Sequence, residues 1–182
     1  MPLSPTAAPG ATEPNVGDKI ALIETNLGRI VVKFFPQAAP NHSDNFLKLA
    51  ESGFYDGVKF HRVIPGFVIQ GGDPNTKDKP RQTHGTGGPG WSVNAEFNDI
   101  PHTPGILSMA RSSDPNSAGS QFFVCTGRVP HLDRQYTVFG QVIEGMDVVE
   151  KIVNLKRDRN DNPLDENPAI MQKVSVASWP LD

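Results

Sequence analysis

The sequence predicts a mainly β domain, either a closed antiparallel β-barrel or a β-sandwich, accompanied by two α-helices. The first observation is a series of short runs rich in β-branched and aromatic residues, separated by turn-forming residues. The second is that only two segments repeat apolar residues at helical spacing. The third is the length of 182 residues, which suffices for one buried core and predicts a single domain.

The N-terminal stretch differs in composition from the rest of the chain. Residues 1–17 contain several Pro, Ala and Thr and no apolar run long enough for a signal peptide or a membrane span. Such a segment cannot bury enough apolar surface to offset the entropy of ordering. We therefore expect residues 1–17 to be a flexible arm and residues 18–182 to be the folded domain.

Charge and cysteine content narrow the possible partners and compartments. The formal net charge is −3 and the chain has no basic block, which argues against nucleic acid and anionic membrane as partners. Cys125 is the only cysteine, so an intrachain disulfide is impossible, and its apolar neighbours predict a buried side chain. These features favour a reducing compartment, and we expect a cytoplasmic protein.

The sheet begins with an antiparallel hairpin. Residues 19–25 (KIALIET) and 29–35 (RIVVKFF) are strand-like, and the intervening Asn-Leu-Gly is typical of a turn. Two prolines, Pro36 and Pro40, then break the sheet pattern. Residues 43–51 repeat apolar side chains at helical spacing and predict the first helix.

The stretch FHRVIPGFVIQGGD predicts two strands, at 58–64 and 67–70, joined by a Pro-Gly turn. Strict alternation along the first strand places Arg62 on the same face as Phe60. An Arg on an apolar face has two explanations. It lies at a sheet edge with its stem over apolar surface, or it holds a guanidinium at the rim of an apolar pocket to contact a substrate.

The segment 74–90 is polar and rich in Gly, Lys and Pro, which predicts a long surface loop. Gly85, Gly87 and Gly90 match the G-x-G-x-x-G pattern of dinucleotide-binding proteins. That pattern binds pyrophosphate only between a strand and the start of a helix. Because residues 91–97 look extended and no strand precedes the glycines, we do not expect a nucleotide site.

The second half of the chain completes the predicted sheet. Further strands are expected at residues 105–110, 121–125, 137–142 and 174–179, and a second helix at residues 145–153.

Conventional catalytic and metal patterns are missing from the sequence. The five His residues lie far apart without the spacing of a zinc motif, so we expect no metal and no cofactor. Ser108 and Ser120 lie inside strand-like runs without the glycine frame of a hydrolase nucleophile. His61 is expected to be a hydrogen-bonded structural residue.

Four ordered blocks resemble one known family. FHRVIPGFVIQGGD, GILSMAR (105–111), SQFFVCT (120–126) and HLDRQYTVFGQV (131–142) are similar to segments of the cyclophilin family of peptidyl-prolyl cis/trans isomerases, over residues 19–179. The resemblance implies a closed eight-stranded antiparallel β-barrel whose ends are covered by two α-helices. It also implies isomerisation of Xaa-Pro peptide bonds and assistance to protein folding.

The resemblance also assigns roles to individual residues. It makes Arg62, Gln70 and Phe123 catalytic, with the Arg62 guanidinium directed at the proline nitrogen. The other implied residues contact the substrate: Phe67, Val68, Ala110, Arg111, Gln121, His131, Leu132 and Tyr136. Taken one at a time, the apolar members of this set are equally explained by core packing.

Departures from the family pattern affect the expected ligands. Val68, Arg111, His131 and Tyr136 stand where many members have Met, Asn, Trp and His. We expect activity to survive, but cyclosporin, the macrocyclic inhibitor of this family, to bind weakly. The expected partners are Pro-containing peptides and unfolded or partly folded proteins, and the chain is expected to act as a monomer. The alternative function is a proline-peptide binding module or chaperone with little turnover.

Overall fold

The computed structural model describes residues 3–182 and shows a closed β-barrel with two α-helices. Around the barrel the strand order is β1-β2-β7-β5-β6-β4-β3-β8, and every neighbouring pair is antiparallel. The strands are β1 (Lys19–Thr25), β2 (Gly28–Phe34), β3 (Val58–Ile64), β4 (Val68–Gly71), β5 (Ile106–Met109), β6 (Phe122–Cys125), β7 (Val138–Glu144) and β8 (Ile170–Ser178). The predicted barrel is confirmed, and the sandwich alternative is wrong.

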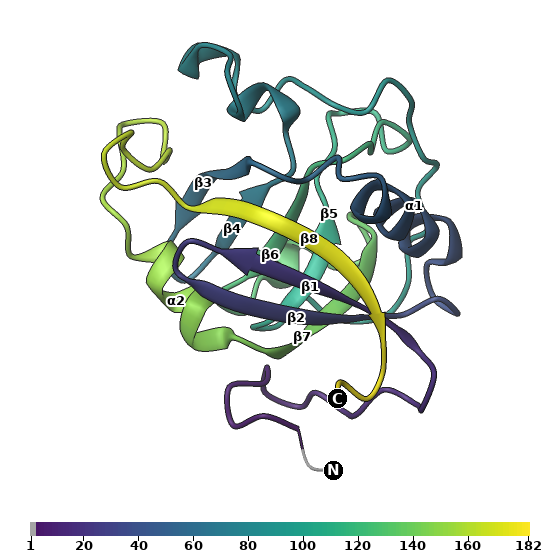
Figure 1. The fold of residues 1–182 in the computed structure, drawn as a ribbon. Coiled ribbons are helices and arrows are strands. Elements are labelled where there is room, and N and C mark those ends of the chain that lie inside the picture. The colour runs from purple at the N-terminus through teal and green to yellow at the C-terminus, as the bar shows by residue number, and fades with distance from the viewer. Residues whose placement is uncertain (1–2) are drawn as a thin grey trace.

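The two helices are α1 (Pro40–Glu51) and α2 (Met146–Val153), at opposite ends of the barrel (Figure 1). Helix α1 begins three residues before the predicted start because Pro40 occupies its first turn, where a missing N–H costs no hydrogen bond. Neither helix is long and apolar enough to cross a membrane, and the same holds for every helix among residues 3–182.

Strand β8 also begins earlier than predicted, at Ile170 instead of residue 174. Exposed Gln172 and Lys173 interrupt its apolar pattern, which hid the start of the strand. Its backbone nevertheless pairs with β1 along most of its length and with β3 at Met171, so sheet closure decides its extent.

The barrel interior is filled by one large apolar cluster. Phe46 of α1 closes one end of this core, with its ring 5.2 Å from that of Phe122 and 5.7 Å from that of Phe139, centroid to centroid. Ile23, Phe60 and the other inward-facing strand residues complete the cluster, all of them at most 2% exposed. Burial of these side chains is the main source of stability for the scaffold that carries the site.

Strand β3 contains a bulge that changes which face Arg62 occupies. Phe60 pairs with Gly71 and Arg62 pairs with Gln70, although Gly71 and Gln70 are adjacent and Phe60 and Arg62 are not. His61 is the extra residue. The prediction that Arg62 shares a face with Phe60 is therefore wrong, because Phe60 lies in the core while Arg62 is exposed beside Gln70 on the outer face. Strict alternation cannot anticipate a bulge.

Residues 3–17 run along the barrel and contact it at several points (Figure 1). The backbone N–H of Ala8 donates to the Val142 carbonyl at 3.1 Å, and the Ala8 side chain is 4% exposed within the main core cluster. Thr6 accepts hydrogen bonds from the backbone N–H groups of Gly145 and Met146 at 3.0 and 2.9 Å, at the start of α2. These contacts replace the side-chain cap that Gly145 cannot provide. The division into an arm and a domain at residue 18 stays a prediction.

Candidate active site

A second apolar cluster lies on the outer face of the barrel, apart from the main core. It is built from strands β4, β5, β6 and β7 and from η3 (Pro130–Leu132), a short 3₁₀ helix. Its members include six of the predicted site residues, namely Phe67, Val68, Ala110, Phe123, Leu132 and Tyr136. Phe67, Ala110 and Tyr136 are only partly buried, so the cluster presents an apolar floor to solvent.

Polar groups border this floor along β3 and β4. The Arg62 guanidinium lies 5.8 Å from the centre of the Phe67 ring, and no carboxylate among residues 3–182 forms an ion pair with it. Gln70, paired with Phe123 across the sheet, donates a hydrogen bond from Nε2 to Oε1 of Gln121 at 3.1 Å. The bulge in β3 thus sets the Arg62 guanidinium opposite the amide of Gln70, which in turn is hydrogen-bonded to the amide of Gln121.

Aromatic stacking fixes the rim of the floor. The imidazole of His131 lies parallel to the Phe67 ring, with centroids 6.0 Å apart and planes 2° apart. Tyr136 packs edge-on against Phe123 at 5.9 Å. The guanidinium of Arg111 lies over the Tyr136 ring, 4.5 Å from its centroid, and donates hydrogen bonds to the Gln135 carbonyl. The predicted site residues therefore lie together, and their individual roles stay predictions.

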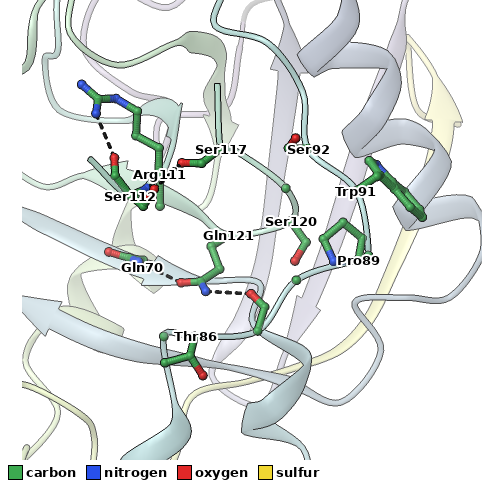
Figure 2. Close-up of a pocket in the computed structure, with 16 residues that line it drawn as sticks. Gln70, Thr86, Pro89, Trp91, Ser92, Arg111, Ser112, Ser117, Ser120 and Gln121 are labelled. Atoms are coloured by element: carbon green, nitrogen blue, oxygen red, sulfur yellow. Dashed lines mark hydrogen bonds between the residues drawn. The ribbon is translucent and has the colours of Figure 1, made fainter. Parts of the chain in front are cut away.

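A groove of about 650 Å³ continues from Gln70 and Gln121 across Ala110 and Arg111. Figure 2 shows Gln70, Gln121 and Arg111 along it. Its opposite wall is the glycine-rich segment 85–92, which spans the end of the predicted surface loop (74–90) and the start of the stretch predicted to be extended (91–97). Gln121 joins the two walls because its Nε2 donates to the Gly87 carbonyl at 2.9 Å. The repeated glycines were the available signal, since they let a backbone approach another closely.

The backbone at Ala110 and Arg111 is suited to pair with an extended peptide. The Ala110 N–H donates to the Gln121 carbonyl at 3.0 Å, which holds the end of β5 against β6. No hydrogen bond joins the Arg111 backbone to another residue in the described part of the chain. Its N–H and C=O are free to form ladder hydrogen bonds with an added strand.

A Ser-His-Asp arrangement lies beneath the floor and was not anticipated. His102 Nδ1 is 3.0 Å from Asp133 Oδ1, and His102 Nε2 is 2.9 Å from Ser108 Oγ. Ser108 is 0% exposed and His102 is 1% exposed, so a substrate cannot reach the hydroxyl. Burial lowers the pKa of His102, which keeps the ring neutral. The His102 ring stacks on Phe123 at 6.0 Å, so the arrangement supports the floor and is not a hydrolase site.

His61, the bulge residue before Arg62, is 6% exposed. The prediction that this ring is hydrogen-bonded is wrong for Nδ1, which is buried without a partner among the described residues. Burial lowers the pKa of His61 from 6.5 to about 4, against the opposing influence of Asp73. The folded state therefore binds fewer protons at this ring than the unfolded state. The stability that neutral His61 contributes is fully present above about pH 6.5 and is lost as the pH falls toward 4. We expect this ring to account for about 3 kcal/mol of lost unfolding free energy at pH 4.

Urea unfolding of the wild type and His61→Gln at pH 7 and pH 4 measures this contribution. The Gln variant should lose much less stability between the two pH values. His131→Gln, which removes an exposed imidazole, is the matched control and should keep the wild-type acid sensitivity. Equal losses in the wild type and His61→Gln would show that burial of His61 does not drive acid destabilisation.

Within residues 3–182, no group of three or more His, Cys, Asp or Glu side chains is arranged to hold a metal ion. Cys125 is buried in the same apolar cluster as Phe123, and burial raises its pKa to about 12, so the thiol stays protonated. The site therefore consists of an apolar floor, the Arg62 guanidinium without an ion pair, two side-chain amides and the backbone of Arg111 without a hydrogen-bond partner.

Known proteins resemble this chain in fold and in sequence. The model of the family described as cyclophilin type peptidyl-prolyl cis-trans isomerase/CLD matches residues 20–176. A peptidyl-prolyl cis-trans isomerase of Synechococcus elongatus is 48% identical over 136 residues, which are 74% of this chain and 88% of the relative. The Arabidopsis thaliana isomerase CYP18-1 is 41% identical over 166 residues, which are 87% of this chain and 96% of the relative.

Solved structures give the same result. A cyclophilin-type isomerase of Cryptosporidium parvum, crystallised in the presence of the dipeptide Ala-Pro, superposes with a TM-score of 0.78 at 34% identity. The match covers 87% of this chain and 99% of the Cryptosporidium chain. Together with the sequence matches, this shows that the chain belongs to the cyclophilin-type peptidyl-prolyl cis-trans isomerase family.

Proposed function

We propose that the protein accelerates rotation about Xaa-Pro peptide bonds by binding the twisted transition state more tightly than either planar isomer. One observation carries this proposal: Arg62 presents an unpaired guanidinium at the edge of an apolar floor, 5.8 Å from the Phe67 ring centre. The family membership and the isomerase relatives support the same activity.

The energetic requirement is modest. Rotation about a peptide bond has a barrier of about 18 to 20 kcal/mol, and uncatalysed Xaa-Pro exchange takes on the order of tens to hundreds of seconds. Exchange in milliseconds requires an acceleration of roughly ten thousandfold, or about 5 to 6 kcal/mol of preferential transition-state binding. No covalent bond is broken, so neither a nucleophile nor a proton donor is needed.

Arg62 provides the preferential binding of the transition state. When the bond twists, the proline nitrogen loses its conjugation and its lone pair becomes a hydrogen-bond acceptor. A guanidinium held at that nitrogen stabilises the twisted form and gains little from the planar one. The prolyl ring occupies the floor over Phe123, with Phe67 and Leu132 beside it. The Gln70 amide contacts the peptide from the same edge as Arg62.

Ala110 and Arg111 hold the residue that precedes proline. The free backbone groups of Arg111 pair with the substrate as an added strand, so that only the bond before the proline remains free to turn. Arg111 therefore acts through its backbone, and its side chain braces Tyr136. Arg111 in place of the Asn of many family members should then lower activity little.

The substrates are exposed Xaa-Pro segments of peptides and of unfolded or partly folded proteins, and the protein acts as a monomer in the cytoplasm. The alternative is a module that binds such segments with little turnover. A protease-coupled assay of a short Xaa-Pro peptide separates the two functions. The proposal requires a rate that rises in proportion to protein concentration, and the binding module requires an unchanged rate.

His131 is expected to weaken inhibition by cyclosporin. The indole of a Trp at this rim position would offer more apolar surface and an N–H donor to the macrocycle. If about 80 Å² of contact is missing, the deficit is about 2 kcal/mol, or roughly thirtyfold in affinity. We therefore expect His131→Trp to be inhibited about thirtyfold more strongly than the wild type.

Titration of cyclosporin against both proteins in one isomerase assay measures this ratio. His131→Gln, which adds no aromatic surface, is the control and should stay weakly inhibited. Equal inhibition constants for the wild type and His131→Trp would show that this position does not control macrocycle binding.

A further inference from the structure

A second groove, of about 810 Å³, meets the proposed site at Arg62 and Gln70. Its walls come from β3 and β4, from the loop around η2 (Arg81–Thr83), and from the loop 156–167. It shares Gln70 and Gly85 with the groove of Figure 2 but extends away from Ala110 and Arg111, which do not line it. The proposed function leaves this groove without a role.

The groove carries more positive than negative charge. Three guanidinium groups, those of Arg62, Arg81 and Arg159, line it together with a single carboxylate, that of Asp158. Arg81 is neutralised, because it pairs with Asp158 at 2.8 Å and with Asp165 at 2.7 Å. Arg62 and Arg159 are exposed.

Neither exposed guanidinium forms an ion pair within residues 3–182. The chain as a whole has a formal net charge of −3, so the two free cations are not part of a generally basic surface. These two guanidinium groups give the groove a local positive charge that would attract an anionic group.

The wall that carries Arg159 is fastened to the strand that carries Arg62. The Val63 N–H donates to the Asp161 carbonyl at 2.8 Å, which ties the loop directly to β3. Arg81 donates to the Asn162 carbonyl at 3.1 Å, and the Asn162 amide lies 3.0 Å from His84 Nδ1. The groove is therefore formed before a ligand arrives, and little ordering entropy opposes binding.

The direction of the substrate decides what enters this groove. In the proposed function, Ala110 and Arg111 hold the residue before proline, and both line the groove of Figure 2. With that residue in the groove of Figure 2, the residues after proline extend toward Arg62, which lines the second groove. We infer, on the basis of the proposed isomerase function, that the Arg62–Arg159 groove binds the residues after proline and selects acidic side chains there.

Two pairs of short peptides test this inference. In the first pair, the second residue after proline is Glu or Gln. In the second pair, the same exchange is made two residues before proline. Exchange NMR should give a Glu-to-Gln ratio in kcat/KM of about threefold to fivefold for the first pair at low ionic strength, the scale of an exposed charge pair. The ratio should fall toward one at about 0.5 M salt, and it should be near one for the second pair.

Arg159→Gln should bring the ratio for the first pair to about one. Lys156→Gln is the matched control, since Lys156 is exposed on the same loop, carries the same charge and does not line the groove. That variant should keep the wild-type ratio. Equal turnover of the Glu and Gln peptides by the wild type, or a preference that survives in Arg159→Gln, would overturn the inference alone. Absence of turnover with every peptide would instead overturn the proposed function and the inference with it.

Discussion

Arg62→Ala is expected to lower kcat/KM for an Xaa-Pro peptide by about a hundredfold to a thousandfold, while folding and peptide binding stay nearly intact. Removal of one preorganised donor to a group that develops in the transition state typically costs about 3 to 4 kcal/mol. Arg62 is exposed and makes no ion pair among residues 3–182, so its loss leaves no buried partner unsatisfied. The apolar floor that binds the prolyl ring is unchanged.

Two further variants sharpen this measurement. Arg62→Lys keeps a positive charge but loses the planar donor fork, so its activity should fall between those of the wild type and Arg62→Ala. Arg128→Ala removes an exposed guanidinium outside the floor and both grooves and should behave as the wild type. Wild-type turnover in a folded Arg62→Ala protein would sink the assigned mechanism.

Deletion of residues 1–16 is expected to lower the unfolding free energy by about 4 kcal/mol. Within its described part, residues 3–16, the segment makes three hydrogen bonds to β7 and the start of α2, through Thr6 and Ala8. Each is worth about 1 kcal/mol, and burial of the Ala8 side chain against the core adds to them. For a chain of this length, the melting temperature should fall by roughly 10 °C.

Thermal unfolding of the truncated and full-length proteins measures the change. Thr6→Val removes only the hydroxyl that accepts the Gly145 N–H and should cost about 1 kcal/mol. Thr12→Val is the matched control and should lower the unfolding free energy little, because within residues 3–182 its hydroxyl bonds only to the ammonium of half-buried Lys33, in a hydrogen bond open to solvent. An unchanged melting temperature after truncation would mean that residues 1–16 behave as the flexible arm that their composition predicts.

Local pattern was sufficient to predict most strands and both helices but not how they combine. Short apolar runs and turn residues located the strands, and β3 agrees with its predicted bounds at both ends. Closure into a barrel depends on pairing between strands that are distant in sequence, such as β1 with β8. Periodicity alone could not decide between a barrel and a sandwich. The bulge at His61 depends on the register between β3 and β4, which strict alternation ignores.

The candidate site was predicted through the family resemblance and not through chemistry visible in the sequence. Phe123 and Leu132 look like ordinary core residues until the barrel places them in a separate outer cluster. The wall formed by segment 85–92 was missed because its contact with Gln121 spans 34 residues of sequence. The Arg159 groove was missed for the same reason, since its two free cations lie on β3 and on a distant loop.

The most direct test of isomerase function is two-dimensional exchange NMR of a short Xaa-Pro peptide with the wild-type protein in substoichiometric amount. This experiment observes the cis and trans populations at equilibrium and therefore separates turnover from binding. The account predicts exchange cross-peaks between the two isomers on a timescale of milliseconds, compared with roughly tens of seconds or longer for the free peptide. Line broadening that reports peptide binding, without exchange cross-peaks, would contradict the account and would identify a proline-peptide binding module instead.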